Sequence, residues 1–257
     1  MAESFPISAV MISRNAEETI AATLESLERF PEVIVYDNGS TDRTVEIARG
    51  FSNVSMHEGE FFGFGPTKNH AAGLASNDWV FSIDSDERIS AELLDSIASA
   101  DLSVDKVAYT VNRANYLRGK RVRFSGWGND WLIRLYNRNV TGLSDAAVHE
   151  IVRPPTGGEV RKLTGDLYHD AVRELGDFLV KIDRYTEIRR QHSRRVIPPA
   201  LIFLRSTWAF IRTYFLRLGI LDGWRGLVIA ICDANGVFFK YMKPYADRAA
   251  ERESNDN

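Results

Sequence analysis

The first hundred residues of this chain alternate between short apolar runs and stretches whose apolar residues recur at helical spacing. The runs have the length and β-branched content of buried strands, and the stretches between them repeat with a period of about 3.6 residues. This alternation predicts an α/β fold with a mostly parallel sheet and helices on both faces. Expected strands cover residues 7–13, 32–37, 53–58 and 78–84, and expected helices cover residues 16–30, 41–51, 67–76 and 90–99.

The pattern changes after residue 104. Residues 105–170 carry further short strand candidates, and the chain from about residue 172 onward reads as helical to its end. We therefore divide the chain into an α/β domain over residues 1–170, made of the halves 1–104 and 105–170, and a helical region over residues 171–257.

Composition limits the class of protein. The 257 residues carry a net charge of −3, which does not suggest a nucleic-acid-binding protein. Cys232 is the only cysteine, so a disulfide within the chain and a cysteine-rich zinc site are excluded, and a reducing compartment is the simplest setting. We expect no secretory signal at the N-terminus and, with no run of about 18 uncharged apolar residues, no membrane-spanning helix.

Polar side chains follow three of the expected strands, at the point where each strand ends. In an open α/β sheet the carboxyl ends of parallel strands share one edge, and ligands bind there. Any one of these groups is also typical of loop or capping chemistry, whereas all three on one edge favour a binding site. The groups are Arg14 and Asn15 after the first strand, Asp37 to Ser40 after the second, and Asp84, Ser85 and Asp86 after the fourth.

The sharpest group is the Asp-x-Asp triplet in the sequence SIDSDE, residues 82–87. Mg²⁺ and Mn²⁺ commonly take one or two carboxylates together with substrate phosphate oxygens. Such a cation neutralises the charge that develops on a phosphate leaving group. The triplet therefore predicts Mg²⁺ or Mn²⁺ as the cofactor.

Four segments resemble family 2 glycosyltransferases of the GT-A fold, and they read ISAVMISRNAEETI, VIVYDNGSTDRTVEIA, GFGPTKNHAAGLASNDWVFSIDSDE and AVHEIV. Two later segments, RYTEIRRQHSRR and FLRSTWAFIRTYFLRLGILDGWRGLVIAICDANGVFFKYMK, resemble the subgroup that adds glucose to the inner core of bacterial lipopolysaccharide. The resemblance covers nearly the whole chain. It implies a GT-A type, Rossmann-like sheet, with residues 1–104 binding a nucleotide sugar and residues 105–170 binding the acceptor.

The resemblance also implies roles for single residues. Asp37 matches the position that hydrogen-bonds the uracil, and the backbone near Arg14 and Asn15 matches the part that holds the base and ribose. Lys68 follows a G-x-G-x-x-K pattern that has neither the Walker spacing nor the dinucleotide fingerprint. It is either a ligand of the diphosphate or uracil or a surface lysine.

By the same resemblance, Asp84 lies near the ribose and sugar, with Ser85 in the same donor-binding group, and Asp86 binds the metal that bridges the diphosphate. An inverting transfer needs in addition a carboxylate that accepts the proton of the acceptor hydroxyl. Glu150 is the expected base, with His149 orienting it or touching the metal or diphosphate. Asp130 is the alternative base.

The helical region combines basic and aromatic residues. Between Arg184 and Arg217 there are eight arginines and one acid, Glu187, with large apolar side chains interleaved. Helices of this composition can lie in the headgroup region of an anionic membrane, or they can simply cover the catalytic domain. We expect membrane docking, and therefore a peripheral protein on the inner face of the cytoplasmic membrane.

The expected function is transfer of a hexose, with inversion and with a metal, from a nucleotide sugar to a glycolipid acceptor. The donor suggested by the resemblance is UDP-glucose, and the acceptor is a heptose of the lipopolysaccharide core. One alternative is transfer of another hexose in O-antigen, capsule or lipid-linked glycan synthesis. Two others are a nucleotide-sugar-binding protein without turnover and a nucleotidyltransferase. Nucleotidyltransferases generally carry a glycine-rich loop with arginine or lysine after the first strand, and this chain has SRNAEET at that place.

Overall fold

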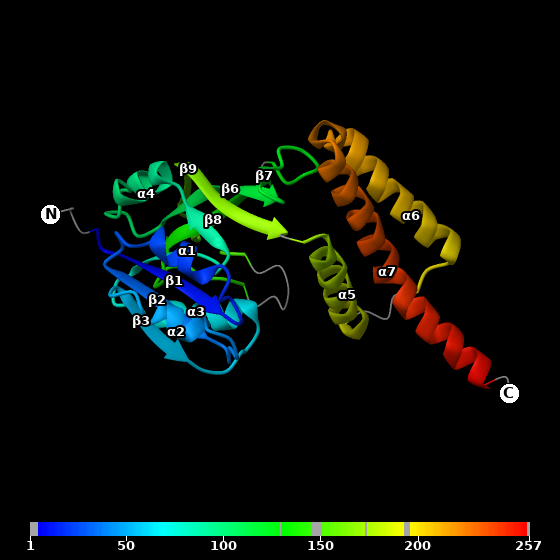
Figure 1. Cartoon of the computed structure of the whole chain (residues 1–257), viewed down its shortest axis with the longest axis horizontal. Coiled ribbons are helices and arrows are strands. Elements are labelled where there is room, and N and C mark those ends of the chain that lie inside the picture. The colour runs from blue at the N-terminus through cyan, green and yellow to red at the C-terminus, as the bar shows by residue number, and fades with distance from the viewer. Residues whose placement is uncertain (1–4, 129, 145–150, 173, 193–195, 256–257) are drawn as a thin grey trace. The chain divides into compact units, whose positions relative to one another are not determined.

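The computed structural model describes residues 5–128, 130–144, 151–172, 174–192 and 196–255 (Figure 1). The chain forms two compact units, each with its own core. The first unit comprises Met1–Ala114 and Asp130–His169, and the second comprises Asn115–Asn129 and Asp170–Asn257.

Four parallel strands form one part of the sheet in the first unit, in the spatial order β3-β2-β1-β4. Each of them pairs in parallel with its neighbours, so their carboxyl ends share an edge, where Ser13 lies opposite Asp37. The parallel sheet predicted for the first hundred residues is confirmed. The strands are β1 (Ile7–Ser13), β2 (Glu32–Asp37), β3 (Val54–Glu58) and β4 (Trp79–Ser82).

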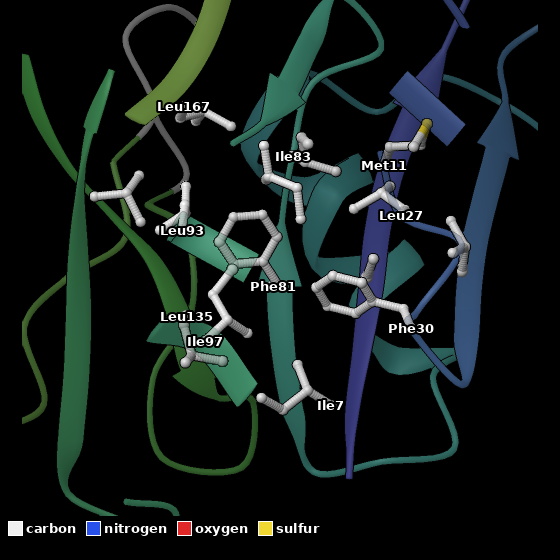
Figure 2. Packing of buried hydrophobic residues seen from close by; sticks show 14 of the residues in the cluster. Ile7, Met11, Leu27, Phe30, Phe81, Ile83, Leu93, Ile97, Leu135 and Leu167 are labelled. Carbon is white, nitrogen blue, oxygen red and sulfur yellow. The ribbon is translucent and has the colours of Figure 1, made fainter. Parts of the chain in front are cut away.

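One face of this sheet is covered by α1 (Ile20–Glu25), α2 (Thr44–Ala48) and α4 (Ala91–Ala98). Alternate residues of a strand point to the same face, and Ile7 and Met11 of β1 accordingly share one buried cluster with residues of these helices. Figure 2 shows Phe30 and Phe81 side by side in this cluster, with ring centroids 5.9 Å apart.

The opposite face is covered by α3 (Phe64–Gly73). Val10 of β1 points to this face and packs with Ala71 and Ala72 of the helix. Helices therefore lie on both faces, as predicted. The small alanine side chains let α3 lie close to the sheet, and this brings Lys68 to the carboxyl edge.

The remaining strands extend the sheet in the order β4-β8-β6-β9-β5, with β7 paired to β6. β8 runs antiparallel to both β4 and β6, and β5 runs antiparallel to β9. The parallel pattern thus holds for the first four strands, whereas β8 pairs antiparallel with β4 and so reverses the strand direction beside them. The strands are β5 (Glu87–Ile89), β6 (Val107–Leu117), β7 (Lys120–Arg121), β8 (Asp130–Asn137) and β9 (Glu159–Val172).

The second unit is mainly helical, as predicted for the end of the chain. Its helices are α5 (Leu175–His192), α6 (Pro199–Ile211), the π-helical η1 (Arg212–Leu216), the 3₁₀-helical η2 (Gly219–Asp222) and α7 (Trp224–Asn255). Figure 1 shows α6 and α7 side by side, joined by the turn that contains η1 and η2. None of the helices in the described part of the chain combines the length and the apolar character needed to cross a membrane.

Candidate active site

The loop after β2 is built around the carboxylate of Asp37, which is almost fully buried. Its Oδ1 accepts hydrogen bonds from the backbone N–H groups of Gly39 and Ser40, at 3.0 and 2.7 Å. Its Oδ2 accepts from the hydroxyls of Ser13 and Ser40. Four donors from the chain itself therefore hold Asp37, and through it the shape of the loop.

The loop after β1 is locked to the same structure. Asn15 has a left-handed backbone with a φ of 52°, a conformation that asparagine tolerates better than most residues. Its N–H donates to Ser40 Oγ at 2.8 Å, and its Oδ1 accepts from Thr41 N at 2.8 Å. Arg14 precedes it and is exposed. The carboxyl ends of β1 and β2 thus form one rigid rim that presents Arg14 to solvent.

The first carboxylate of the Asp-x-Asp triplet lies between two cations. Lys68 Nζ lies 2.6 Å from Asp84 Oδ1, and Arg134 Nη2 donates to Asp84 Oδ2 at 2.9 Å. Burial alone would raise the pKa of Asp84, but the charges of Lys68 and Arg134 outweigh it and hold that pKa well below its usual 3.8. Lys68 is buried, so the interpretation of it as a surface lysine is wrong.

Glu87, the residue after the triplet, is completely buried, with an exposed fraction of 0%. Arg134 Nη2 donates to both of its carboxylate oxygens, at 2.6 and 2.8 Å, and Asp84 N donates to Oε2 at 3.0 Å. Burial raises the pKa of Glu87 above its usual 4.5, and the nearby charge of Asp84 adds to this effect, whereas Arg134 opposes it. These two carboxyl groups and the guanidinium therefore act as one unit beneath the loop.

Asp130 is connected to the same unit through Arg113. Arg113 Nε donates to Asp130 Oδ2 at 2.8 Å, and its Nη1 lies 3.4 Å from Glu87 Oε1. Lys68, Asp84, Arg134, Glu87, Arg113 and Asp130 form a continuous row of alternating positive and negative charges across α3, β8, β5 and β6. These linked ion pairs hold the backbone that carries the triplet in place.

Asp86, the second carboxylate of the triplet, is the most exposed of these acids, with 39% of its side chain accessible. Its Oδ2 lies 3.6 Å from Nε2 of His169 on β9. The pairing of β5 with β9 places His169 directly opposite Glu87 and so brings it beside the triplet.

The residues at this position fit a divalent cation. A carboxylate and an imidazole are both accepted ligands of Mn²⁺, and Mg²⁺ usually keeps several sites for water and substrate oxygens. Within the described ranges, no group of three or more His, Cys, Asp and Glu side chains is arranged to hold a metal by itself. Asp86 and His169 therefore suit a cation that shares its remaining ligands with a bound phosphate.

Three further residues complete the predicted set. Ser85 is half-buried, and its carbonyl oxygen accepts a hydrogen bond from Thr23 Oγ1 at 3.0 Å, which fixes the triplet to α1. His149 and Glu150 lie outside the described residues.

Sequence reasoning missed four side chains here: Arg113, Arg134, Glu87 and His169. Arg113 and Arg134 sit inside strand patterns, where an arginine reads as a solvent-facing residue, yet Arg134 is buried. Glu87 is adjacent to the triplet and lies between Asp86 and Arg88, so its sequence neighbours give no sign that it is buried. The histidine is distant in the sequence and has no ligand spacing, so only strand pairing reveals it.

Comparison with known proteins identifies the family of the chain. The profile of the family described as "Glycosyl transferase family 2" matches residues 8–151 of the chain. The chain is 29% identical to a lipopolysaccharide core biosynthesis glycosyltransferase, LpsC, of Rhizobium meliloti, over 99% of this chain and 97% of that protein. It is 28% identical to an uncharacterized glycosyltransferase of Rickettsia typhi, over 92% and 86% of the two chains.

Among solved structures, the chain resembles S. aureus TarS 1–349 in complex with UDP-GlcNAc. The TM-score is 0.51 at 19% identity, over 73% of this chain and 65% of that one. At this identity the similarity concerns the fold alone, and it agrees with the α/β architecture of the first unit.

Proposed function

The chain belongs to glycosyl transferase family 2, and we propose that it transfers glucose from UDP-glucose to a heptose of the lipopolysaccharide core, with inversion at the anomeric carbon. The choice of acceptor is supported by the similarity to LpsC along almost the entire length of both proteins. The observation that carries the proposal is the contrast inside the Asp-x-Asp triplet. The carboxylate of Asp84 is paired with Lys68 and Arg134. Asp86, by contrast, remains accessible beside His169.

The donor is proposed to bind along the rim formed by the loops after β1 and β2. Four donors occupy the carboxylate of Asp37, so a uracil there would meet a preformed loop and replace or share one of those bonds. Arg14 is exposed on the rim, where it can reach the base, the ribose or a phosphate. Asn15 keeps the rim in shape, and Ser85 and Asp84 lie beyond β4 on the same edge.

Lys68 is proposed to serve the donor through Asp84. The pair is positioned before the donor arrives, because Lys68 Nζ already touches Asp84 Oδ1 at 2.6 Å. A diphosphate near this pair would draw on the positive charge of Lys68 without ordering a long side chain, whose rotamer entropy has already been lost on folding.

Asp86 and His169 are the residues proposed to hold Mg²⁺ or Mn²⁺. When bound, the cation supplies positive charge to the diphosphate as the bond to the sugar breaks. The row of charges beneath the triplet keeps Asp86 in position, because the carboxylate of the next residue, Glu87, accepts hydrogen bonds from both Arg134 and the N–H of Asp84.

The proton of the acceptor hydroxyl is proposed to pass to Glu150, which His149 would orient. In this step, the acceptor oxygen forms a bond to the anomeric carbon, and its proton moves to the carboxylate. UDP leaves with the electrons of the broken bond between the anomeric carbon and the diphosphate oxygen. Asp130 is the alternative base. Its carboxylate is paired with Arg113 at 2.8 Å, so it would have to give up that contact to accept a proton.

The helical unit is proposed to dock the enzyme on the anionic inner face of the cytoplasmic membrane, where a glycolipid acceptor is displayed. Support comes from the arginines and aromatic residues that share α5 and α6, and from the large exposed apolar side chains of this unit.

A direct test offers the purified protein a panel of nucleotide sugars with truncated core oligosaccharides. We expect transfer from UDP-glucose to a heptose-terminated acceptor, and a β-linkage in the product, as determined by NMR, would establish inversion. Transfer of a different hexose to another acceptor would contradict the donor assignment. Binding of nucleotide sugars without any transfer or hydrolysis would contradict the enzymatic proposal itself.

A further inference from the structure

The turn that joins α6 to α7 exposes an unusual density of large apolar side chains. We call residues 215–227 the apolar turn. Leu216 and Leu221 are its most exposed members, with accessible fractions of 63% and 62%. Soluble surfaces rarely carry contiguous apolar area of this kind without a function. The exposed apolar residues of the turn are Phe215, Leu216, Leu218, Ile220, Leu221, Trp224 and Leu227.

The exposure does not come from a loose loop, because the turn is fixed from behind. Asp222 accepts hydrogen bonds from the N–H groups of Arg123 and Phe124, at 3.0 and 2.9 Å, and Ser125 N donates to Arg217 O at 2.9 Å. Three backbone donors of one segment thus hold both η1 and η2. The apolar side chains of the turn are kept on its outer side.

Glycine makes this arrangement possible at one close contact. A Cβ on Gly226, in the first turn of α7, would lie 1.7 Å from the carbonyl oxygen of Gly219. Gly219 itself is buried against Ser125 and the backbone of Thr213. The backbone of the turn is therefore packed as tightly as a core, while its large side chains remain uncovered.

Arginines outnumber acids in the apolar turn and the residues that flank it, although Asp233 of α7 lies near Arg212 and Arg217. Residues 205–231 contain four arginines and a single acid, Asp222, whose carboxylate is engaged by backbone donors. Arg212 and Arg217 are exposed. The guanidinium of Arg225 lies 4.4 Å from the ring centre of Trp224, an aromatic residue of the type enriched at membrane interfaces.

We propose that the apolar turn inserts into an anionic lipid bilayer, with its leucines below the headgroups and its arginines at headgroup level. This inference rests on the membrane docking proposed above and names the element responsible. Leucine and tryptophan at the centre with arginine at the margin match the composition of an interfacial anchor. A second copy of the chain is a less suitable partner, because a self-complementary contact would bring arginines of the same sign together.

The arginines of α5, by contrast, are partly paired with acidic residues of the protein itself. Arg190 pairs with both Glu187 and Asp247, at 2.7 and 2.9 Å. Charge alone is thus a weaker anchor than the sequence indicates. Insertion of the turn predicts binding that survives high salt, since apolar burial is not screened, whereas purely electrostatic docking is lost when the Debye length falls to about 3 Å at 1 M salt.

The test measures sedimentation of the full-length protein with phosphatidylcholine vesicles that contain about one third phosphatidylglycerol. The variant combines Leu216→Glu with Leu221→Glu. The matched control combines Leu179→Glu with Val180→Glu on α5, where the exposed fractions are 63% and 69%. All four side chains are exposed, so both variants are expected to keep the circular dichroism spectrum and thermal midpoint of the wild type.

We expect the wild type to remain bound to the vesicles in 1 M NaCl. The turn variant should bind at least about tenfold more weakly, because each substitution removes the favourable free energy of transferring a leucine side chain into the bilayer and adds a charge. The control should lose much less. Trp224 should add a fluorescence component that is quenched by lipids brominated in their acyl chains, and Trp224→Phe should remove it. Complete release of the wild type by salt would overturn the proposal, as would equal losses in the two variants.

Two outcomes separate this inference from the proposed chemistry. Transfer to a delipidated core oligosaccharide needs no bilayer, so the turn variant should keep that activity. If the wild type transfers sugar but ignores vesicles and instead forms a dimer that the turn variant breaks, the turn contacts a second copy and the membrane proposal is wrong. If vesicles bind through the turn but no donor is used, the insertion stands and the enzymatic proposal fails.

Discussion

Lys68 Nζ lies 2.6 Å from Asp84 Oδ1, so one carboxylate of the Asp-x-Asp triplet is already paired within the protein. Asp86, two residues later, keeps 39% of its side chain accessible. Carboxylates in one site commonly take separate roles when their environments differ. The two carboxylates of the triplet therefore differ in environment: Asp84 is paired with side chains of the protein, whereas Asp86 is accessible and is the one that we propose to face the ligand.

The first prediction concerns Asp86. Asp86→Asn should lower kcat/KM for sugar transfer by at least about 100-fold, because the leaving diphosphate loses its compensating cation. A chelator should inactivate the wild type, and Mg²⁺ or Mn²⁺ should restore it. Asp78→Asn is the control, since Asp78 precedes the other end of β4 and is 62% exposed. Full activity after thorough chelation would refute the metal dependence.

A second prediction separates His169 from Asp86. His169→Ala should raise the concentration of metal needed for half-maximal activity, while activity at saturating metal stays close to that of the wild type. The reason is that an imidazole ligand contributes to affinity, whereas the remaining ligands still position the cation. A titration of activity with Mn²⁺ measures this. An unchanged metal requirement would show that His169 only packs beside the triplet.

The third prediction identifies the base. Glu150→Gln should reduce transfer by about 10²- to 10⁴-fold with donor binding retained, because the shape is kept and the proton acceptor is lost. Asp130→Asn is the comparison, and rate measurements should be paired with calorimetric titration of UDP-glucose. If Asp130→Asn alone abolishes transfer, Asp130 is the base. If Glu150→Gln abolishes donor binding, Glu150 belongs with the diphosphate or metal ligands.

The fourth prediction concerns stability. Glu87→Gln should lower the free energy of unfolding by about 3 kcal/mol or more, because Arg134 stays buried with one fewer carboxylate. The control is Glu58→Gln, which breaks a solvent-exposed pair with Arg49 and should cost less than about 1 kcal/mol. Urea unfolding measures both. Equal losses would mean that the buried row of charges is not a source of stability.

A fifth prediction follows from the depressed pKa of Asp84. A carboxyl group whose pKa is lower in the folded protein contributes stability above its ordinary value of 3.8, and that contribution disappears as the pH falls through the folded pKa. Urea unfolding of the wild type and of Asp84→Asn should therefore differ by a constant amount at neutral pH. The difference should shrink below pH 3.8. A difference that is independent of pH down to acid unfolding would contradict the assignment.

Strands β1 and β2 were predictable because they are buried on both faces. β1 and β2 occupy the residues that the apolar runs indicated. Ser90, the first residue of the expected helix over residues 90–99, caps α4, because its Oγ accepts a hydrogen bond from Leu93 N. Helix ends were less accessible to prediction. The expected helix over residues 16–30 is reduced to α1, because the chain beyond it continues as turns with i→i−3 hydrogen bonds, such as that from Leu27 N to Leu24 O at 2.9 Å.

The shared edge at which the loops after β1, β2 and β4 lie was also predictable, since parallel strands bring their carboxyl ends together. The row of charges was not. Arg134 and Glu87 are 47 positions apart in the sequence, and only antiparallel pairing of β4 with β8 brings them within reach. Short strands such as β5 also escape any periodicity, so the contact between Asp86 and His169 could not be anticipated.

β6 and β9 each begin in the first unit and end in the second, and residues 115–129 belong to the second unit although the first unit continues after them. Leu117 and Val122 are buried together with Val172, Phe178 and Ile229. A chain truncated at residue 170 would therefore retain apolar residues whose partners had been removed, and should aggregate. A chimaera that exchanges the helical unit between relatives must accordingly carry two grafts, one internal and one terminal, so the catalytic and helical parts are not interchangeable modules.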